Sequence, residues 1–592
     1  MKTSFIRYIF LISFFGGATH LVVAQQDTTR LRKEVEVVKA YQPSISDAFK
    51  INDIPQIKQN AAEKPVFDYR INSQPVFSTF SVEPVQAAQM AREPKAEQGN
   101  GLLKGGIGNY KTPYAELFYN TEAGRRSAFG MHFKHLSSNG KIKLLNDDKV
   151  KAPHSENLAA LYATHNFRKA TLDAKLHFSK QAFRYYGYSG DSLTNARKEM
   201  LMPFWDFKQA FSKGGLEVQL TGDENPRSDL FYKANFQYQH FSTKSGQKEN
   251  LVKLSGLIDK EFDQFWGQLD AGLTVLKTDS IFNQAFGEYG KKQQLVLKLN
   301  PSVLFSTDEA SLRIGLNSYS VMDDDTNGDY MLAPLVKAEW SPVENMLTLF
   351  AGTDGKIQHN HYSAIAAENQ FVTPYQDIKN TKYNYILTAG LRGKFSSKFN
   401  FRVQADYAKI KNQHFFILNE DKYLGAEDPF LKSNTFDVVY DRMKQLTLGG
   451  ELFFVASKDF SLLVNSKFYS YDLNNLAEAW QKPGYEAGAS LNFHPEGPLS
   501  LTADILLFGE RKALIQTAIY DPVISNTEPV QTEETIFTID PVLDINFGLN
   551  YQYSSKLSFW GKVNNFAFQK YESWLGYTQK GLNLLVGASY SF

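Results

Sequence analysis

The sequence predicts an all-β fold, a transmembrane antiparallel β-barrel of about 22 strands. Three observations lead to this prediction: a last strand that alternates up to the final residue, a secretory leader at the start, and tight turns that recur along the chain. A membrane-spanning β-strand needs about 9–11 residues, with one side toward lipid and the other toward the lumen. Alternating segments of this length, joined by short turns, are the pattern expected of a barrel.

The last strand is the clearest alternating segment. Its apolar face carries six side chains, those of Leu582, Leu584, Val586, Ala588, Tyr590 and Phe592. Its other face carries mostly small or polar residues, and only Leu585 breaks the pattern, which predicts a strand with one apolar side. The segment resembles the closing strand of bacterial outer-membrane barrels. That resemblance implies an insertion signal read by the barrel-assembly machinery, at Leu584, Val586, Tyr590 and Phe592.

The N-terminus predicts a secretory signal peptide over residues 1–24. Lys2 and Arg7 give a positive start, residues 8–15 form a short apolar core, and Val22-Val23-Ala24 precedes Gln25 as a small-residue cleavage pattern. This core is shorter than the ~20 apolar residues of a membrane helix. The chain has no cysteine, so disulfides, thiol chemistry and a lipid-modified cysteine are excluded. We therefore expect a mature protein held among outer-membrane lipids by its own strands.

Charge and composition exclude other classes of protein. Lys and Arg number 64 against 63 Asp and Glu, so no basic field points to nucleic acid. No stretch after the leader reaches 18 consecutive apolar residues, so helical spans are not expected. Tyr and Phe number 31 and 46, a surplus that suits the aromatic girdles of a barrel, although a large soluble β-protein could also carry it.

From about residue 101 onward, alternating segments dominate. Residues 232–238, 399–407 and 543–553 each place apolar and polar side chains on opposite faces. Arg402 and Asp406 recur mid-strand on the polar face, as expected of a water-filled lumen. A soluble sandwich would alternate in a similar way, but the signal peptide and the closing strand favour the barrel. We therefore expect residues 101–592 to form it.

Short polar segments predict ten tight turns, and these set the strand count. They are Glu122–Arg125, Arg168–Lys169, Ser212–Gly215, Glu261–Gln264, Thr307–Ala310, Ser341–Asn345, Ser396–Lys398, Ser457–Asp459, Pro495–Pro498 and Ser554–Lys556. Ten hairpins give twenty strands, to which a first strand near 102–110 and the closing strand are added. The resulting 22 is even, with both ends on the periplasmic side, as in bacterial single-chain barrels.

The longer connections are then expected on the extracellular side. They are rich in Asn, Asp, Gly and Ser, as loops are. The clearest ones are residues 139–157, 188–202, 278–291, 358–382, 411–436 and 511–537.

The C-terminal 34 residues resemble those of TonB-dependent receptors. In that family, an Asn-Leu-Phe-like element leads to a Lys-Tyr pair, a Gly-Tyr loop and a Gly that opens the last strand. The corresponding residues are Asn565-Phe566, Lys570-Tyr571, Gly576-Tyr577 and Gly581. The count of 22 strands extends the resemblance to residues 101–592. It implies a receptor that takes up a substrate across the cell outer membrane.

A second resemblance lies near the mature N-terminus. The segment is similar to a TonB box, an extended stretch that pairs with the energy-transducing protein TonB. A β-prone run in a tail suits strand addition to a partner sheet. Many Val-rich pentamers would match equally well, so both interpretations stay open. The residues of this segment are Glu34, Val35, Glu36, Val37 and Val38.

The N-terminal segment departs from the family. TonB-dependent receptors carry a globular plug domain that is much longer than the 76 residues of 25–100, which contain six prolines. Barrels of this width are normally plugged. Either this Pro-rich segment enters the lumen, or loops fold in, or a partner closes the pore. A plugless barrel would be a structural or interaction component of a complex with another outer-membrane or lipoprotein partner. An open diffusion porin is the third alternative.

The chain offers one candidate calcium site and no candidate catalytic site. Asp323, Asp325 and Asn327, with Asp329 nearby, fit the start of a D-x-D-x-N-G calcium loop. Pro334 stands where such a loop has its bidentate Glu, and an Asn-Gly turn would explain the pattern equally well.

Metal binding by histidine and catalysis are not expected. His359 and His361 could share a transition metal, but they have no third ligand, and a solvated loop is favoured. No phosphate loop and no G-x-S-x-G pattern occurs, so we expect no enzyme and no other cofactor.

Overall fold

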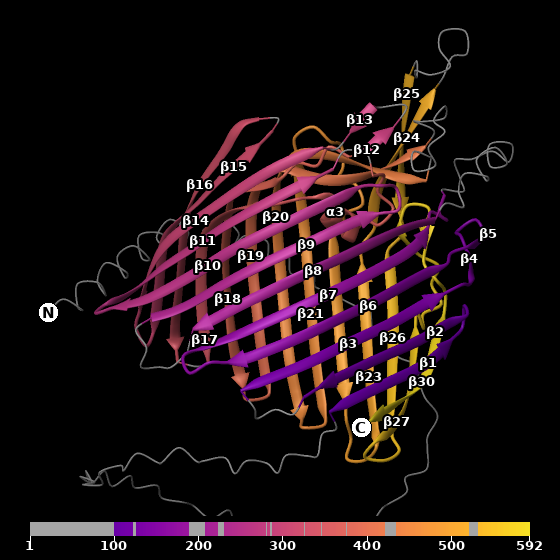
Figure 1. The fold of residues 1–592 in the computed structure, drawn as a ribbon, viewed down its shortest axis with the longest axis horizontal. Coiled ribbons are helices and arrows are strands. Elements are labelled where there is room, and N and C mark those ends of the chain that lie inside the picture. Colours follow the sequence, from indigo (N-terminus) through magenta and orange to yellow (C-terminus); the bar gives the residue numbers. More distant parts are fainter. Residues whose placement is uncertain are drawn as a thin grey trace, which may run out of the picture. The chain divides into compact units, whose positions relative to one another are not determined.

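The barrel is closed by its first and last strands. A computed structural model describes residues 100–592 except 122–125, 189–207, 223–229, 280, 284–286, 290, 325, 345, 375, 421–433 and 520–530. Within them, 22 antiparallel strands form a ring in which β1 (Gly101–Gly108) pairs with β30 (Asn583–Ser591) (Figure 1). No helix among these residues is long and apolar enough to cross a membrane. The predicted all-β barrel and its strand count are confirmed.

Each strand pairs with its neighbours around the ring in chain order. Between β1 and β30 the order is β2 (Thr112–Asn120), β3 (Ser127–Ser138), β6 (His154–Asn166), β7 (Ala170–Arg184), β8 (Lys208–Gly222), β9 (Leu230–Thr243), β10 (Lys248–Phe262), β11 (Phe265–Thr278), β14 (Lys292–Ser306), β15 (Ala310–Asp323), β16 (Thr326–Val343), β17 (Leu347–Gln358), β18 (Thr381–Ser396), β19 (Phe399–Glu420), β20 (Thr435–Ser457), β21 (Phe460–Leu473), β22 (Tyr485–Phe493), β23 (Leu499–Phe508), β26 (Val542–Gln552) and β27 (Leu557–Asn564).

The predicted turns fall where the hairpins are, with one error. Eight lie between neighbouring strands, and Glu122–Arg125, outside the described residues, falls between β2 and β3 in the sequence. Ser212–Gly215 is not a turn, because β8 runs through it. Gly215 serves close packing instead: a Cβ there would lie 2.6 Å from the His177 ring. The connection lies between Gly222 and Leu230.

The closing strand has the two faces that its sequence predicts. Leu584, Val586, Tyr590 and Phe592 are 41, 57, 45 and 46 % exposed, whereas Ser589 on the other face is 6 % exposed. An exposed apolar face on a closed barrel is the face toward lipid. The same alternation continues through neighbouring strands, so the polar faces line the lumen.

Aromatic side chains gather near the tight turns, as girdles do. The rings of Phe262 and Phe265, which flank one turn, lie 5.1 Å apart, and those of Phe395 and Phe401, which flank another, lie 4.6 Å apart. The composition predicts aromatic girdles, and these pairs lie at the end of the barrel that carries the tight turns.

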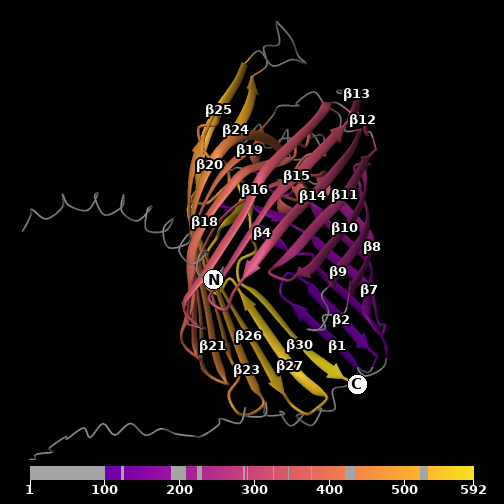
Figure 2. The ribbon, with the colours of Figure 1, turned by 90° about the vertical axis from the view of Figure 1, so that its left-hand side faces the viewer.

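The strands differ in length, so the wall is uneven (Figure 2). β19 and β20 have 22 and 23 residues, whereas β1 and β27 have 8 each. The predicted loop 411–436 is therefore too long, since β19 continues to Glu420 and β20 starts at Thr435. β19 and β20 stay paired through this stretch because its apolar residues contain no turn residues that would end the strands earlier.

Several predicted outer loops contain structure of their own. The structure places short elements in four of these connections, and 188–202 lies largely outside the described residues. The elements are β4 (Lys141–Lys143), β5 (Lys149–Lys151), β12 (Ile281–Asn283), β13 (Gly287–Tyr289), α3 (Tyr362–Glu368), β24 (Arg511–Ile519) and β25 (Gln531–Ile539), and a further hairpin β28 (Glu572–Trp574) with β29 (Tyr577–Thr578) precedes the closing strand.

Candidate functional site

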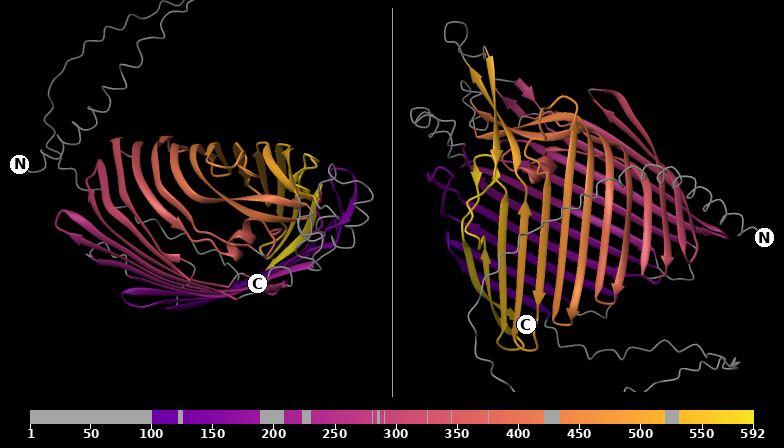
Figure 3. Two further views of the ribbon diagram at one scale, coloured as in Figure 1. Left: turned by 90° about the horizontal axis from the view of Figure 1, so that it is seen from above. Right: turned by 180° about the vertical axis from the view of Figure 1, so that it is seen from behind.

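The connection between β17 and β18 folds back inside the ring of strands. We call residues 359–380 the lid; residue 375 lies outside the described residues. Seen from above, this segment and its helix α3 lie within the barrel and beside the wall (Figure 3). Its contacts, given below, are to lumen-facing side chains on both sides of the barrel.

The wall supplies the N-cap of the lid helix. Glu249 on β10 is 3 % exposed, and its two oxygens accept the backbone N–H groups of Tyr362 at 2.7 Å and Ser363 at 2.9 Å. His361, the N-cap position, makes no side-chain cap of its own. The first N–H groups of a helix have no partner within it and carry partial positive charge. A buried carboxylate from the opposite element therefore satisfies them and fixes the helix to the wall.

Further hydrogen bonds hold the lid to the same side of the lumen. They involve three wall strands, β7, β9 and β14. The pairs are Gln181 Nε2 to Gln370 Oε1 at 2.6 Å, Gln239 Nε2 to Ser363 Oγ at 3.2 Å, Asn380 Nδ2 to Gln294 Oε1 at 3.0 Å, and Lys292 Nζ to the Ile378 carbonyl at 2.9 Å.

The lid also reaches β19 and β20, elsewhere on the ring. Glu368 Oε2 lies 2.6 Å from His414 Nε2. The lid backbone at Phe371 and Thr373 exchanges hydrogen bonds of 3.0 Å with Phe436. These strands are well separated from β7–β14 in the order of the ring. The lid therefore crosses the lumen and connects two separate parts of the wall.

An apolar core forms beneath and around the lid. Tyr362, Phe371 and Val372 are at most 2 % exposed and pack against aromatic rings at the ends of β7, β8 and β9. The Phe371 ring stacks on Tyr577 with centroids 3.5 Å apart and planes 17° apart. Burial of such rings dominates the energetics of a packed interior. The lid is therefore a packed layer.

The C-terminal motif is part of this layer. Tyr577 donates its hydroxyl to the Asn434 carbonyl, and Tyr186 donates to the Thr578 carbonyl at 3.1 Å. Burial raises the pKa of the Tyr577 hydroxyl well above its usual value, so it stays a donor. Arg511 donates to the carbonyls of Glu572 and Ser573. The Gly-Tyr element that carries the family resemblance thus packs against one side of the lid.

The packing of the lid shifts the pKa values of two of its ionisable groups. Burial lowers the pKa of His359 to about 3, and neither ring nitrogen has a hydrogen-bond partner among the described residues. Burial disfavours the charged form of Glu368, but its hydrogen bond with His414 and the charge of Lys482 lower its pKa below the usual value.

The predicted calcium residues lie on the β15–β16 hairpin. Asp323 Oδ2 lies 3.2 Å from Lys292 Nζ and 3.0 Å from Gln294 Nε2, and Asp329 forms an ion pair with Lys382. Asp325 lies outside the described residues, and the Asn327 side chain is not described. Among the described residues no group of three His, Asp or Glu side chains could hold a metal ion. Calcium binding stays a prediction.

The remaining predicted residues are the two histidines of the lid and the residues near the N-terminus, and one residue of the site was not predicted. His361 lies against Glu249, with Nδ1 3.2 Å from Oε2, and its ring is 5.8 Å from that of His359. The signal peptide, the TonB-box-like residues Glu34–Val38 and nearly all of the segment 25–100 lie outside the described residues. Sequence reasoning missed Glu249, because a single acidic residue at the start of a strand carries no local signal for a helix cap.

The barrel resembles solved outer-membrane receptors and transporters. No protein-family model matches the sequence, and no curated protein matches it. The pyoverdine outer membrane receptor FpvA of Pseudomonas aeruginosa is 11 % identical, with a TM-score of 0.59 over 85 % of this chain and 80 % of that one. The FrpB iron transporter of Neisseria meningitidis is 11 % identical, with a TM-score of 0.59 over 84 and 82 %. The copper transporter OprC is 12 % identical, with a TM-score of 0.57 over 85 and 82 %.

At these identities the likeness concerns the fold. This chain itself has a closed ring of 22 strands among its described residues and an exposed apolar outer face. Both belong to proteins of the outer membrane. The chain is therefore an outer-membrane β-barrel whose fold is similar to that of these solved proteins.

Proposed function

We propose that this barrel takes up a substrate across the outer membrane, as TonB-dependent receptors do. The observation that carries the proposal is the lid, which crosses a wide lumen and is fixed to the wall through Glu249. A lid hydrogen bond between neutral groups contributes about 0.5–1.5 kcal/mol net, and one to the Glu249 carboxylate about 1.5–3 kcal/mol. The lid and its aromatic core are separate from the strand pairing that closes the ring, so displacement of the lid leaves the wall paired, which is what passage of a substrate requires.

The energy for this displacement comes, in this proposal, from TonB. The segment Glu34–Val38 would add as a strand to a sheet of the TonB C-terminal domain. The neighbours with the same fold include a siderophore receptor and metal transporters, which supports small ligands from outside the cell as the class of substrate.

The test is binding of the mature protein to the purified TonB C-terminal domain. Val37→Pro removes a backbone donor from the box-like segment and is expected to abolish binding. Val82→Pro places the same substitution outside the segment and is the control. Equal binding by wild type and Val37→Pro would contradict TonB coupling.

A second candidate is a subunit of an outer-membrane complex, and one observation favours it. The hairpin of β24 and β25 extends from the outer end of the barrel (Figure 1), and β25 pairs only with β24 among the described strands. An open strand edge is a template for a partner strand. Ile536 on β25 is 55 % exposed.

Co-purification in mild detergent separates the two functions. A stoichiometric outer-membrane or lipoprotein partner that is lost in Ile536→Lys would support the complex. A lone protein with substrate-dependent uptake in intact cells would support the transporter.

A further inference from the structure

A serine, a histidine and an asparagine are hydrogen-bonded in series on the wall of the barrel. His135 Nε2 lies 3.1 Å from Ser137 Oγ, and His135 Nδ1 lies 2.7 Å from Asn157 Oδ1. The Asn157 amide donates its Nδ2 to Ser155 Oγ at 3.3 Å, which is consistent with the amide oxygen facing the histidine. The three groups thus form a continuous Asn–His–Ser chain.

The backbone of β3 and β6 fixes this arrangement. His135 and Ser137 are two residues apart on β3, so their side chains share one face. Asn157 on β6 is directly opposite His135, and Ser155 is directly opposite Ser137. Groups placed by strand register are held more rigidly than groups on loops. The geometry is therefore a property of the sheet.

The face that carries the chain of hydrogen bonds is the one toward lipid. Phe129 and Phe133 alternate with His135 on β3 and are 59 and 42 % exposed. His132 and Lys134 point to the opposite face, where they pair with Glu116 and Glu156. His135 and Ser137 follow the last exposed phenylalanine, toward the outer end of the strand. They therefore stand where the apolar band gives way to the outer-leaflet interface.

We propose that Ser137, His135 and Asn157 form a serine esterase site for acyl esters of outer-membrane lipids. Such triads are recognised by geometry and roles and not by sequence position. With Nδ1–H donated to Asn157, the neutral ring leaves Nε2 free to accept the Ser137 proton. A serine on a β-strand does not need the G-x-S-x-G turn, which is why the sequence pattern gives no sign of it.

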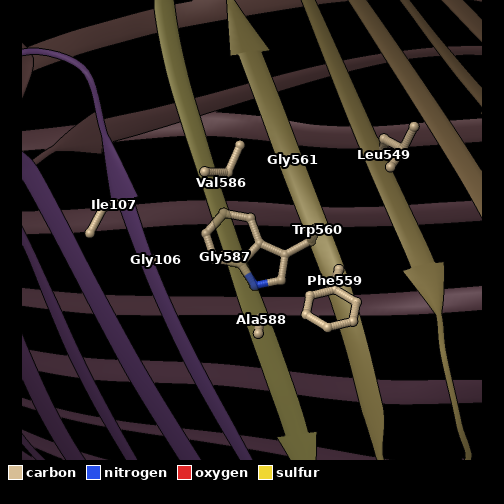
Figure 4. A pocket seen from close by; sticks show the side chains of 9 residues that line it. All are labelled: Gly106, Ile107, Leu549, Phe559, Trp560, Gly561, Val586, Gly587 and Ala588. Atoms are coloured by element: carbon tan, nitrogen blue, oxygen red, sulfur yellow. The ribbon is translucent and has the colours of Figure 1, made fainter.

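An apolar hollow of about 640 Å³ lies on the same face and would hold the acyl chain (Figure 4). Its lining includes Ile107, Phe559, Val586 and Ala588 at the seam where the barrel closes. Strand pairing leads from the triad to this hollow through small residues only. The paired positions are His135, Ala115, Gly105 and Ala588 in turn.

This path is open and of useful length. A Cβ on Gly105 would meet no atom within 4 Å. Three strand spacings of about 4.8 Å give about 14 Å from His135 to Ala588. An extended acyl chain lying across the strands would therefore bring its ester to Ser137 while its tail occupies the hollow. Exposed Lys180, opposite Asn157 on β7, offers a positive charge to the headgroup.

The reaction needs only the ester and water. Ser137 Oγ attacks the carbonyl carbon, its proton passes to His135 Nε2, and the carbon–oxygen bond to the alcohol breaks as that proton reaches the leaving oxygen. The Ser155 hydroxyl and the Lys180 ammonium are donors on the same face for the oxyanion. Water then attacks the acyl-serine, His135 takes and returns its proton, and the fatty acid leaves.

The first test is covalent labelling of the full chain in mild detergent by hexadecylsulfonyl fluoride. One probe per chain on Ser137 is expected, found by intact mass and peptide mapping, with none in Ser137→Ala. Ser127 is the matched control, since it is on the same strand and 2.7 Å from His165 Nδ1, with no third member of a triad among the described residues. Ser127→Ala should label as wild type does. No label on wild type, or a label that persists in Ser137→Ala, would overturn the proposal.

The second test separates catalysis from structure. Asn157 acts through His135 as a positioning residue, so Asn157→Ala should slow labelling and Asn157→Asp should restore it. His135→Ala removes the general base and should slow labelling by about 10²–10⁴-fold. Heat-dependent gel mobility checks that each variant keeps its barrel. Equal rates in folded His135→Ala and wild type would also overturn the proposal.

The substrate source is distinguished by two lipid preparations. Fatty-acid release from phosphatidylethanolamine vesicles identifies a phospholipid, and release from purified lipopolysaccharide identifies an acylated saccharide lipid. Release from neither by a wild type that labels at Ser137 would contradict the assignment to membrane lipids.

Discussion

Glu249 in the barrel wall caps the helix that begins at Tyr362 in the lid. The two residues are 113 positions apart in the chain, and the carboxylate accepts the Tyr362 N–H at 2.7 Å. The same carboxylate accepts a second N–H and contacts His361. One buried anion in the wall thus caps the lid helix, beside the other lid–wall hydrogen bonds. Loss of that anion should loosen the lid and leave the barrel intact.

The first prediction concerns this cap. Glu249→Gln keeps the size of the side chain but turns an amide donor toward a backbone donor, which should cost about 1–3 kcal/mol at a buried site. Single-channel recording in planar bilayers should show larger or more frequent open states than in wild type. Glu156→Gln, which removes a wall carboxylate paired with Lys134 away from the lid, is the control. Unchanged recordings for Glu249→Gln would show that the cap does not hold the lid.

The second prediction concerns the stacked pair of Phe371 and Tyr577. Tyr577→Ala removes a fully buried ring and should destabilise the lid layer by about 3–5 kcal/mol. Limited proteolysis of the folded protein should then cut within residues 359–380 more quickly. Tyr553→Ala, at a ring that is 68 % exposed, should leave the cleavage rate unchanged. Equal protection of the lid in both variants would contradict the packing role of Tyr577.

The third prediction concerns acid. The pKa of His359 is about 3 in the folded lid, below the ordinary 6.5 of the unfolded chain. The group therefore contributes stability that is complete above pH 6.5 and is lost as the pH falls, because the unfolded form then binds the extra proton. The loss is at most about 1.4 kcal/mol per pH unit between these values.

Protease protection of the lid should thus weaken between pH 7 and pH 5. His359→Leu should flatten this dependence, because the residue no longer titrates. The lowered pKa of Glu368 adds a further loss only below its ordinary 4.5. A pH dependence that is identical in wild type and His359→Leu would rule out the histidine as its source.

The fourth prediction concerns closure of the barrel. A Cβ on Gly587 would lie 2.2 Å from the Gly105 carbonyl oxygen and 2.3 Å from the Trp560 ring. Gly587→Ala should therefore hinder pairing of β30 with β1 and reduce the yield of heat-modifiable, folded protein. Gly561→Ala is the control, since its Cβ would have no neighbour closer than 3.9 Å. Normal folding of Gly587→Ala would show that the seam can widen.

Local patterns were enough for the barrel wall. Alternation identified the faces of Leu584 and Ser589 correctly, because side-chain direction on a strand follows sequence position alone. Turn residues located the hairpins because a turn, like the alternation on a strand, depends on a few neighbouring positions. The error at Ser212–Gly215 came from interpreting two glycines as a turn, although Gly215 makes room for the His177 ring of the preceding strand. That room is a property of two strands together.

The lid could not be predicted in this way. Residues 358–382 were expected to form an outer loop, which is correct in chain order but says nothing of direction. The fold inward depends on Glu249, Gln239 and Gln181, which lie on three other strands. The Ser137–His135–Asn157 series likewise depends on the register between β3 and β6. Neither arrangement leaves a motif in the chain.

The amino-acid sequence alone was enough to predict the all-β class, the 22 strands and the lipid-facing side of the wall. These follow from a period of two and from turn residues, which act over a few neighbouring positions. The three-dimensional fold was needed to show that the β17–β18 connection crosses the lumen and that Glu249 caps its helix. Contacts between residues more than a hundred positions apart depend on the arrangement of the whole ring, in which burial and pairing of polar groups select one path for the loop.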